Sequence, residues 1–489
     1  MCAHHRLPSH LEIGRKHLTI DGHDTVALVA EHGSPLFIFS ERRIAANASG
    51  FLQSARRGHA RAGVFFASKA CSNLHVLRVM RAQGLGVEVN SGGELWKALA
   101  AGFAPQAIVF NGVAKTILEL QEAITRGIKA INVESAFEMQ RIAEVAAALG
   151  RRATVALRVV PGIGGGATAG IQTGSARSKF GMTEPELRVA LAIAQAHPRA
   201  IDVAGLHLHI GSQVAETSDF AAAVAFAARI SRDVAQALGG PLHHFNLGGG
   251  YPVDYAHLDA GSNTTRAEDL RGFVVRASAA PMVGEVAARA ARELGGGIEI
   301  LFEPGRSLVA DAAILLSRIE NARQRDGTPW LYLDAGYNLL IDSAAVRWYY
   351  HMLNAGRMDA DADTAFRVVG PLCDSADCFF DVEGEHLWTA LSGRLAGLLP
   401  ETLAAVRAEI VRLPGTRRLP AATAPGDLIA LLDTGAYSLG EMFQYCGRQR
   451  AKAIMIGARN EIVTLRERDA PEDLLDGAER PLADFPAVP

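Results

Sequence analysis

The 489-residue sequence is poor in cysteine, has no long apolar run and carries little net charge. Its five cysteines are odd in number and lack the spacing of metal ligands, which favours a reduced, cytoplasmic protein over a disulfide framework. No apolar run approaches the ~18 residues of a membrane span, and residues 1–9 contain no apolar stretch typical of a signal peptide. The formal net charge of −3 gives no reason to expect a nucleic-acid or membrane partner.

What the chain does contain is a regular alternation of strands and helices that begins at residue 63. Strands are predicted over 63–68, 85–90, 107–111, 130–134, 154–160, 203–210, 243–247 and 298–303. Helices are predicted between them, over 72–83, 92–101, 116–126, 135–149, 184–197, 217–238 and 282–294. This alternation predicts an α/β fold with a (β/α)8 barrel, which we place at residues 44–311.

An open, doubly wound sheet is the alternative, but it would need a dinucleotide fingerprint at its first turn, and none is there. A glycine-rich segment over 162–167 does fit the pattern G-x-G-x-x-A. It follows the fifth predicted strand, and no helix is predicted to begin there, so we interpret it as a loop.

The alternation stops after the barrel. Strands predicted over 313–319, 330–333, 366–369, 427–432 and 453–456 indicate a β-rich second domain over residues 312–489. Within this domain, apolar residues at helical spacing predict a helical insert over 386–412. Short apolar stretches over 11–40 predict strands that precede the barrel.

Functional side chains gather at the predicted C-terminal ends of the barrel strands, where (β/α)8 enzymes carry their active sites. They are Lys69, Glu88, Asn111, Glu134, Arg158, His209, Gly248, Gly249, Gly250, Glu303 and Arg306. This concentration predicts an enzyme. Lys69 is its central member, because a lysine at the end of a buried strand can form a Schiff base with a carbonyl, as in enzymes that use pyridoxal phosphate. The alternative is a lysine that reaches solvent.

Other motifs also have both a structural and a functional interpretation. The three glycines after residue 247 can bind a phosphate through backbone N–H groups or can form a tight turn. Glu303 and Arg306 can pair with each other, or can bind a pyridine nitrogen and a carboxylate. His207 and His209 face the same side of a strand, but no third ligand at a suitable spacing accompanies them, so no metal site is predicted.

Nine segments, taken in order, identify a family. They read FFASKACSNLHVL, GVEVNSGGEL, IVFNG, SKFGM, GLHLHIGSQ, NLGGGYPVDY, EPGR, GPLCDSADCF and GDLIALLDTGAY. From about residue 15 to residue 465 the chain resembles the fold-type III pyridoxal phosphate decarboxylases that act on diaminopimelate and ornithine. The resemblance implies an alanine-racemase-like barrel and a C-terminal β domain that strands of residues 1–43 complete. It also implies a homodimer whose active sites use residues of both chains.

The resemblance further implies roles for individual residues. Lys69 is similar to the Schiff-base lysine, His209 to the histidine stacked on the cofactor ring, and Glu303 to the partner of the pyridine nitrogen. Further cofactor contacts are implied for Glu88, Ser212, Gly249, Gly250, Gly305, Arg306 and Tyr437. Cys373 is implied to enter the neighbouring subunit's site as the acid that reprotonates Cα, with Asp374 as a substrate contact beside it. Without the resemblance, a free cysteine and a half-buried tyrosine at these positions would be ordinary packing residues.

Departures from the family's pattern concern the substrate. Diaminopimelate decarboxylases follow their DAG segment with an Arg-Pro pair and a tyrosine that hold the substrate's distal carboxylate, whereas Asp342 and Ser343 stand there in this chain. Asp374 stands where those enzymes usually have glutamate. With Arg306, the two aspartates are expected to bind the substrate, and two carboxylates favour an ammonium over another carboxylate.

The sequence therefore predicts decarboxylation of a basic amino acid such as ornithine or lysine, the D forms included, and a place near the D-ornithine/D-lysine decarboxylases. A meso-diaminopimelate decarboxylase that yields L-lysine is the first alternative, and a decarboxylase of a specialised biosynthetic pathway is the next. A racemase would need a tyrosine base in place of Cys373, and a non-catalytic relative should have lost its main cofactor contacts. For Asp342, the alternative is a side chain that points to solvent or pairs with Arg347.

Overall fold

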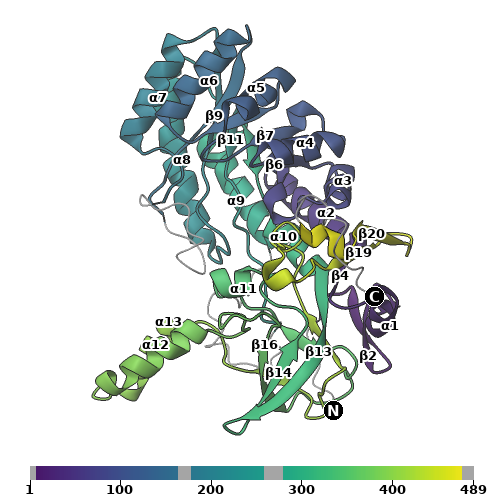
Figure 1. Cartoon of the computed structure of the whole chain (residues 1–489). Coiled ribbons are helices and arrows are strands. Elements are labelled where there is room, and N and C mark those ends of the chain that lie inside the picture. Colours follow the sequence, from purple (N-terminus) through teal and green to yellow (C-terminus); the bar gives the residue numbers. More distant parts are fainter. Residues whose placement is uncertain (1–6, 164–177, 258–278, 476–489) are drawn as a thin grey trace.

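The computed structural model describes residues 7–163, 178–257 and 279–475. Within them, parallel strands form a closed barrel in which the last strand pairs with the first (Figure 1). The strands are β5 (Ala62–Ala67), β6 (Gly86–Val89), β7 (Ile108–Phe110), β8 (Ala130–Val133), β9 (Ala153–Arg158), β10 (Ile201–His207), β11 (His244–Asn246) and β12 (Glu299–Phe302). Each coincides with a predicted strand, so the prediction of a (β/α)8 barrel is confirmed.

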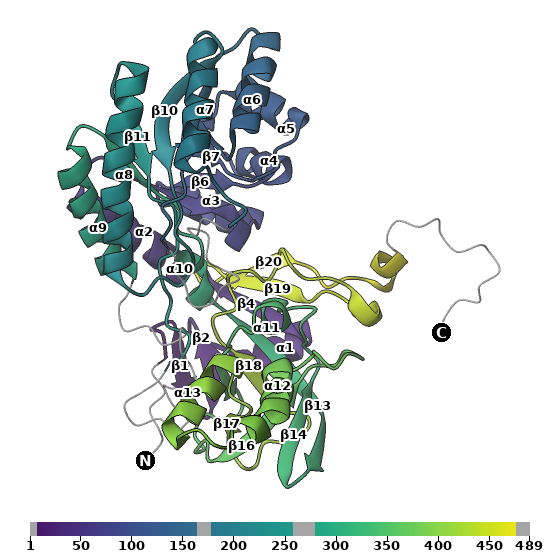
Figure 2. The ribbon, with the colours of Figure 1, turned by 90° about the vertical axis from the view of Figure 1, so that its left-hand side faces the viewer.

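Helices form the outer layer of the barrel (Figures 1 and 2). The predicted ones are α3 (Leu74–Ala82), α4 (Gly92–Ala100), α5 (Ile117–Arg126), α6 (Ala136–Ala148), α7 (Glu184–Ala196), α8 (Thr217–Leu238) and α9 (Ala279–Leu294). The side chains of Asn73, Ser91, Thr116 and Ser135 accept hydrogen bonds from the first backbone N–H groups of α3 to α6. Such N-caps define where each loop at the barrel mouth ends and its helix begins.

The sequence prediction missed the helix α2 (Glu41–Gly58), which precedes the first barrel strand. Its buried face consists of Ile44, Ala48, Phe51, Leu52, Ser54 and Ala55. This is helical spacing, so the signal was present. The helix packs closely against α9, because a Cβ atom added at Gly58 would lie 2.2 Å from the backbone oxygen of Gly284. It thereby completes the helical layer between α9 and α3.

The second domain is built on a nine-stranded sheet. Its strands are β4 (Leu36–Ser40), β13 (Ala313–Arg325), β14 (Thr328–Leu333), β15 (Met352–Asn354), β16 (Thr364–Val369), β17 (Arg417–Leu419), β18 (Leu428–Leu431), β19 (Lys452–Ile456) and β20 (Ile462–Arg466). The N-terminal strand β4 runs antiparallel to β13 and parallel to β19. It is therefore an interior strand of a sheet whose other strands all follow the barrel. Together, barrel and β-rich domain confirm the predicted fold class.

The segment before β4 contains more than the predicted strands. A three-stranded sheet of β1 (Leu11–Gly14), β2 (His17–Ile20) and β3 (His23–Asp24) is followed by the helix α1 (Thr25–His32). The prediction of strands alone was wrong for α1. Asp24 starts this helix, because its side chain accepts hydrogen bonds from the first backbone N–H groups.

Among the described residues, the β domain also contains three short α-helices. Residues 386–412, predicted as a helical insert, contain most of α12 (Val382–Ser392) and all of α13 (Pro400–Ile410), and the two helices project from the domain (Figure 1). The short helix α11 (Asp342–Ala345) lies on the side of the domain that faces the barrel (Figure 1).

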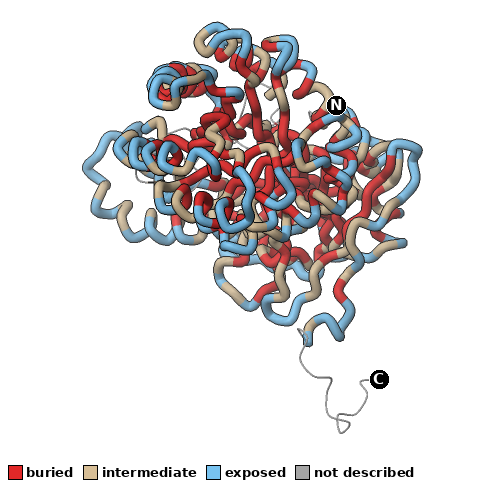
Figure 3. The backbone as a smooth tube through the Cα atoms, turned by 90° about the horizontal axis from the view of Figure 1, so that it is seen from above, coloured by how far each residue is buried: buried red, intermediate tan, exposed pale blue. Residues whose placement is uncertain are grey.

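Buried residues lie along the barrel strands and the β sheet, while the outer faces of the helices are exposed (Figure 3). In the part of the chain that the structure describes, no helix has both the length and the apolar character needed to cross a membrane.

Candidate active site

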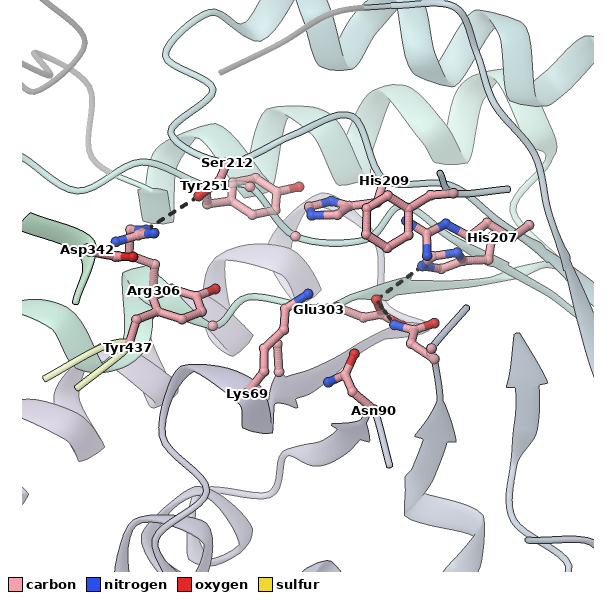
Figure 4. A pocket seen from close by; sticks show the side chains of 18 of the residues that line it. Lys69, Asn90, His207, His209, Ser212, Tyr251, Glu303, Arg306, Asp342 and Tyr437 are labelled. Carbon is pink, nitrogen blue, oxygen red and sulfur yellow. Dashed lines mark hydrogen bonds and ion pairs between the residues drawn. The ribbon is translucent and has the colours of Figure 1, made fainter. Parts of the chain in front are cut away.

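The carboxyl ends of the barrel strands surround a cavity of about 300 Å³, and the β domain completes its wall (Figure 4). Ten of the predicted site residues line it: Lys69, His209, Ser212, Gly249, Gly250, Glu303, Gly305, Arg306, Asp342 and Tyr437. The last-named aspartate and tyrosine belong to the β domain and the others to the barrel. The fold thus gathers residues that lie up to several hundred positions apart in the sequence.

Three predicted residues lie outside this wall. Glu88, at the end of β6, is fully buried and accepts a hydrogen bond from Asn111, which does line the cavity. Cys373 is exposed in the β domain. Its neighbour Asp374 accepts a hydrogen bond from the hydroxyl of Tyr337 at 2.7 Å. Within one chain, therefore, Cys373 and Asp374 are not brought to Lys69.

Lys69 lies in the middle of the cavity, with Glu303 on one side and Ser212, Arg306 and Tyr437 on the other (Figure 4). Burial has the largest single effect and lowers the pKa of Lys69, but Glu88, Tyr437 and Glu303 together outweigh it, so the pKa of Lys69 lies above its ordinary value. Free in the cavity, this lysine is therefore an ammonium that must lose a proton before it can act as a nucleophile.

The carboxylate of Glu303 accepts four hydrogen bonds from surrounding side chains. Its Oε2 accepts hydrogen bonds from Asn111 at 2.9 Å and from Nε2 of His207 at 3.1 Å. Its Oε1 accepts from Asn246 at 2.7 Å and from Asn132 at 3.3 Å. Burial alone would raise its pKa, but His207 and the amide donors lower the pKa of Glu303 to about 2. A buried carboxylate that stays ionised can hold a positive charge opposite it.

The other end of the cavity offers hydrogen-bond donors and closely packed glycines. Gly250 has a φ of +100°, and a Cβ atom there would lie 2.4 Å from the backbone oxygen of Gly211. At Gly249 the corresponding distance to the backbone oxygen of Glu303 is 2.3 Å. Only glycine fits such a turn. Nearby, Nε of Arg306 donates to the hydroxyl of Ser212 at 3.4 Å.

Arg306 and Asp342 place opposite charges at this end. The guanidinium carbon of Arg306 lies 3.9 Å from the ring centroid of Trp348 and 4.4 Å from that of Tyr437. Burial raises the pKa of Asp342, while Arg306 opposes the shift. Arg347 pairs with Asp381 at 2.9 Å. Asp342 therefore lines the cavity and does not pair with Arg347 or point to bulk solvent, the two alternatives that the sequence left open.

The residues of the cavity fit the cofactor that the sequence resemblance implies. Pyridoxal phosphate presents a ring nitrogen, an aldehyde and a phosphate in that order along the molecule. The cavity presents the carboxylate of Glu303, the amine of Lys69 and the hydroxyls of Ser212 and Tyr437 in the matching order (Figure 4). Gly249 and Gly250 also line it. The glycine turn leaves backbone N–H groups accessible to an anion.

Several residues that line the cavity were given no cofactor or substrate role from the sequence: Asn90, Asn111, Arg158, Phe180, His207, Tyr251 and Val346. Asn111 and Arg158 were among the functional side chains predicted at the strand ends, and both do line the cavity. Tyr251 is fully buried and stacks on Phe220 at 4.7 Å, so its sequence signal is that of an ordinary core aromatic.

Two further predictions concern metal and nucleotide sites. Among the residues whose structure is described, no group of three or more His, Cys, Asp or Glu side chains is arranged to hold a metal ion. Of the two histidines considered, His207 bonds to Glu303. The glycine-rich segment 162–167 lies mostly outside the described residues, since only Gly162 and Ile163 belong to them.

Comparison with known proteins identifies the family to which this chain belongs. The family described as "Pyridoxal-dependent decarboxylase, pyridoxal binding domain" matches residues 44–310. Diaminopimelate decarboxylase of Archaeoglobus fulgidus is 30% identical over 460 residues, which cover 94% of this chain and 96% of that protein. Diaminopimelate decarboxylase of Methanothermobacter thermautotrophicus is 30% identical over 472 residues, covering 96% and 98%.

Solved structures agree with this result. The crystal structure of diaminopimelate decarboxylase from M. jannaschii superimposes with a TM-score of 0.79 at 26% identity and covers 96% of this chain and 98% of that one. Lysine/ornithine decarboxylase of Vibrio vulnificus, with a TM-score of 0.66 at 18% identity over 88% of this chain and 96% of that one, shares the fold. Since the family covers the whole barrel and its members match the chain almost from end to end, this protein belongs to the pyridoxal-dependent decarboxylases and is a carboxy-lyase with pyridoxal phosphate as its cofactor.

Proposed function

We propose that this enzyme decarboxylates meso-diaminopimelate to L-lysine. The observation that carries the proposal is the proximity of Arg306 and Asp342 in the wall of the cavity. The far end of meso-diaminopimelate carries both a carboxylate and an ammonium, and these two side chains match that pair of charges. The relatives, which are diaminopimelate decarboxylases, support the same substrate. Asp342 alone would repel a second carboxylate, as the sequence predicted, but Arg306 balances its negative charge.

A basic amino acid such as lysine or ornithine, the D forms included, is the second candidate. It is favoured by the aspartate at position 342, where diaminopimelate decarboxylases carry an arginine. Asp374 would add another carboxylate if the neighbouring subunit supplies it. Both candidates are diamino acids, and the reaction at Cα is the same. Since the relatives are decarboxylases, the racemase and non-catalytic alternatives have no support.

The residues act on the reaction through charge and position. Bound pyridoxal phosphate supplies an electron sink for the pair left at Cα when CO2 departs. Glu303, held ionised by its four donors, keeps the ring nitrogen protonated. Burial lowers the pKa of His209 well below its ordinary value, with Lys69 and Arg158 adding to the effect, so a neutral imidazole faces the cavity. We assign the return of a proton to Cα to the thiol of Cys373 from a second copy of the chain.

A panel of substrates tests the proposal. We expect meso-diaminopimelate to have a higher kcat/KM than L-lysine, D-lysine, L-ornithine, D-ornithine or arginine. A higher kcat/KM for lysine or ornithine would decide for the second candidate, and its L or D form would give the stereochemistry at Cα.

Asp342→Asn tests the contact directly. A charge-assisted hydrogen bond contributes roughly 1.5–3 kcal/mol, so losing it should lower kcat/KM for the preferred diamino acid by roughly 10- to 150-fold. Asp361→Asn, which changes an exposed carboxylate of the same domain, is the matched control and should leave kcat/KM unchanged. Equal kcat/KM values in the Asp342 variant and the control would contradict a substrate contact at Asp342.

A further inference from the structure

Arg306 is a buried cation that aromatic rings and hydroxyls hold in place of a carboxylate. It is 7% exposed and lines the cavity. Within the described residues its hydrogen bonds go to the hydroxyls of Tyr255 at 3.1 Å and Ser212 at 3.4 Å, and no carboxylate forms an ion pair with it. Its guanidinium carbon lies 3.9 Å from the ring centroid of Trp348. A ring face attracts a desolvated guanidinium but occupies none of its five N–H groups, so donors remain for an anionic ligand.

Trp348 is itself fixed by its packing. Its side chain is 1% exposed, and its ring meets that of the fully buried Tyr255 at 88°, with the centroids 5.1 Å apart. Trp348 therefore offers Arg306 a ring face, and Tyr255 offers it a hydroxyl. Because Tyr255 belongs to the barrel and Trp348 to the β domain, the two domains hold this guanidinium together.

The backbone of Trp348 is tied to Asp342. Its N–H group donates to the backbone oxygen of Asp342 at 2.9 Å, which closes the turn after α11. The side chains of Asp342 and Arg306 lie beside each other in the cavity wall (Figure 4). The segment 342–348 thus carries both the negative charge of this pair and the ring that holds the positive charge.

We propose that Trp348 is a positioning residue that sets the specificity of the enzyme for the far end of its substrate. Its indole face holds the guanidinium of Arg306, and its backbone holds Asp342, so the two charges are in place before the substrate arrives. A substrate end with one carboxylate and one ammonium fits such a pair. Binding is tighter when no side chain has to be ordered on association. The inference rests on the proposed function, in which Arg306 receives a carboxylate.

Two ligands that differ in one carboxylate test this role. L-Lysine, the product of the proposed reaction, keeps the far-end carboxylate, whereas 1,5-diaminopentane lacks it. Each is titrated into the holoenzyme, and its dissociation constant is read from the visible spectrum of the cofactor. Trp348→Leu should weaken the binding of L-lysine by roughly 2- to 12-fold, the effect of having to order one long side chain on binding. The dissociation constant of 1,5-diaminopentane should stay the same.

Three further variants separate positioning from packing. Trp348→Phe, which keeps a ring, should recover most of the affinity for L-lysine. Tyr255→Phe removes only the hydroxyl that accepts from Arg306, so it disturbs folding less and should also weaken L-lysine alone. Trp96→Leu is the matched control, because this indole of α4 is 70% exposed, and it should change neither dissociation constant.

The outcomes distinguish this inference from the proposed function. In the wild type, we expect L-lysine to bind more tightly than 1,5-diaminopentane. Equal binding would show that the site recognises no carboxylate, which would overturn the proposed function and the inference with it. If the wild-type preference persists unchanged in Trp348→Leu, or in Tyr255→Phe should Trp348→Leu not fold, the inference alone is wrong. An equal loss of affinity for both ligands would also overturn it, because that result indicates lost packing only.

Discussion

Lys69→Ala is expected to abolish both turnover and the yellow colour of the holoenzyme. Lys69 lies between the ionised carboxylate of Glu303 and the donor-rich end of the cavity, where it can bond to the cofactor's aldehyde (Figure 4). Turnover should fall by at least the roughly 10²–10⁴-fold that a single acid–base group contributes. The measurements are the visible spectrum, the decarboxylation rate, and borohydride reduction followed by peptide mapping, which should find the cofactor attached at Lys69.

Lys97→Ala is the matched control for this experiment. Lys97 is an exposed lysine of α4, outside the cavity, and donates to the hydroxyl of Ser72 at 2.9 Å. This variant should keep its spectrum and rate. An unchanged spectrum and rate in the Lys69 variant would refute the assignment of Lys69.

Mixing two inactive variants should restore activity. Because Cys373 is exposed and lies outside the cavity of its own chain, we expect it to act in the site of a second copy. Lys69→Ala and Cys373→Ala should each be nearly inactive. In an equal mixture, half of the dimers combine the two variants and each of these has one intact site, so about a quarter of the wild-type rate should return.

The control for the mixing experiment replaces another exposed cysteine of the same domain. Cys446→Ala should be active by itself, because the resemblance gives a role in the neighbouring subunit's site to Cys373 and not to Cys446. Subunit exchange is verified with two affinity tags. If tagged heterodimers form and no activity returns, the two residues do not share a site across subunits.

The barrel was predictable from the sequence because each of its units repeats the same pattern. Strand β5 and helix α3, for example, are a short apolar run followed by apolar residues at helical spacing, and Asn73 marks the start of the helix. Helix α1 was not predicted, because its apolar residues continue those of the preceding strands and only Asp24 signals a helix. Strands as short as β15 and β17 contain too few residues for an alternation to be recognised.

The barrel part of the site was predictable from the sequence, but the contribution of the β domain was not. Strand ends of the barrel converge by construction, so Lys69 and Glu303 could be expected to meet. No such rule applies to Asp342, which reaches the cavity through the short helix α11 of the other domain. Arg306 lies near Asp342 and offsets its negative charge, but the sequence does not show this proximity because the two residues belong to different domains.

The position of β4 has a consequence for how the chain folds. This strand is made early in synthesis, yet its partners β13 and β19 are made only after the whole barrel. Until then both of its edges lack partners, which is the condition that favours aggregation of a nascent chain. A fragment that begins at residue 312 would lack the same strand and leave a gap in the middle of its sheet. The two domains are separate in space but depend on each other to fold. Truncation between them should therefore yield insoluble protein from either half.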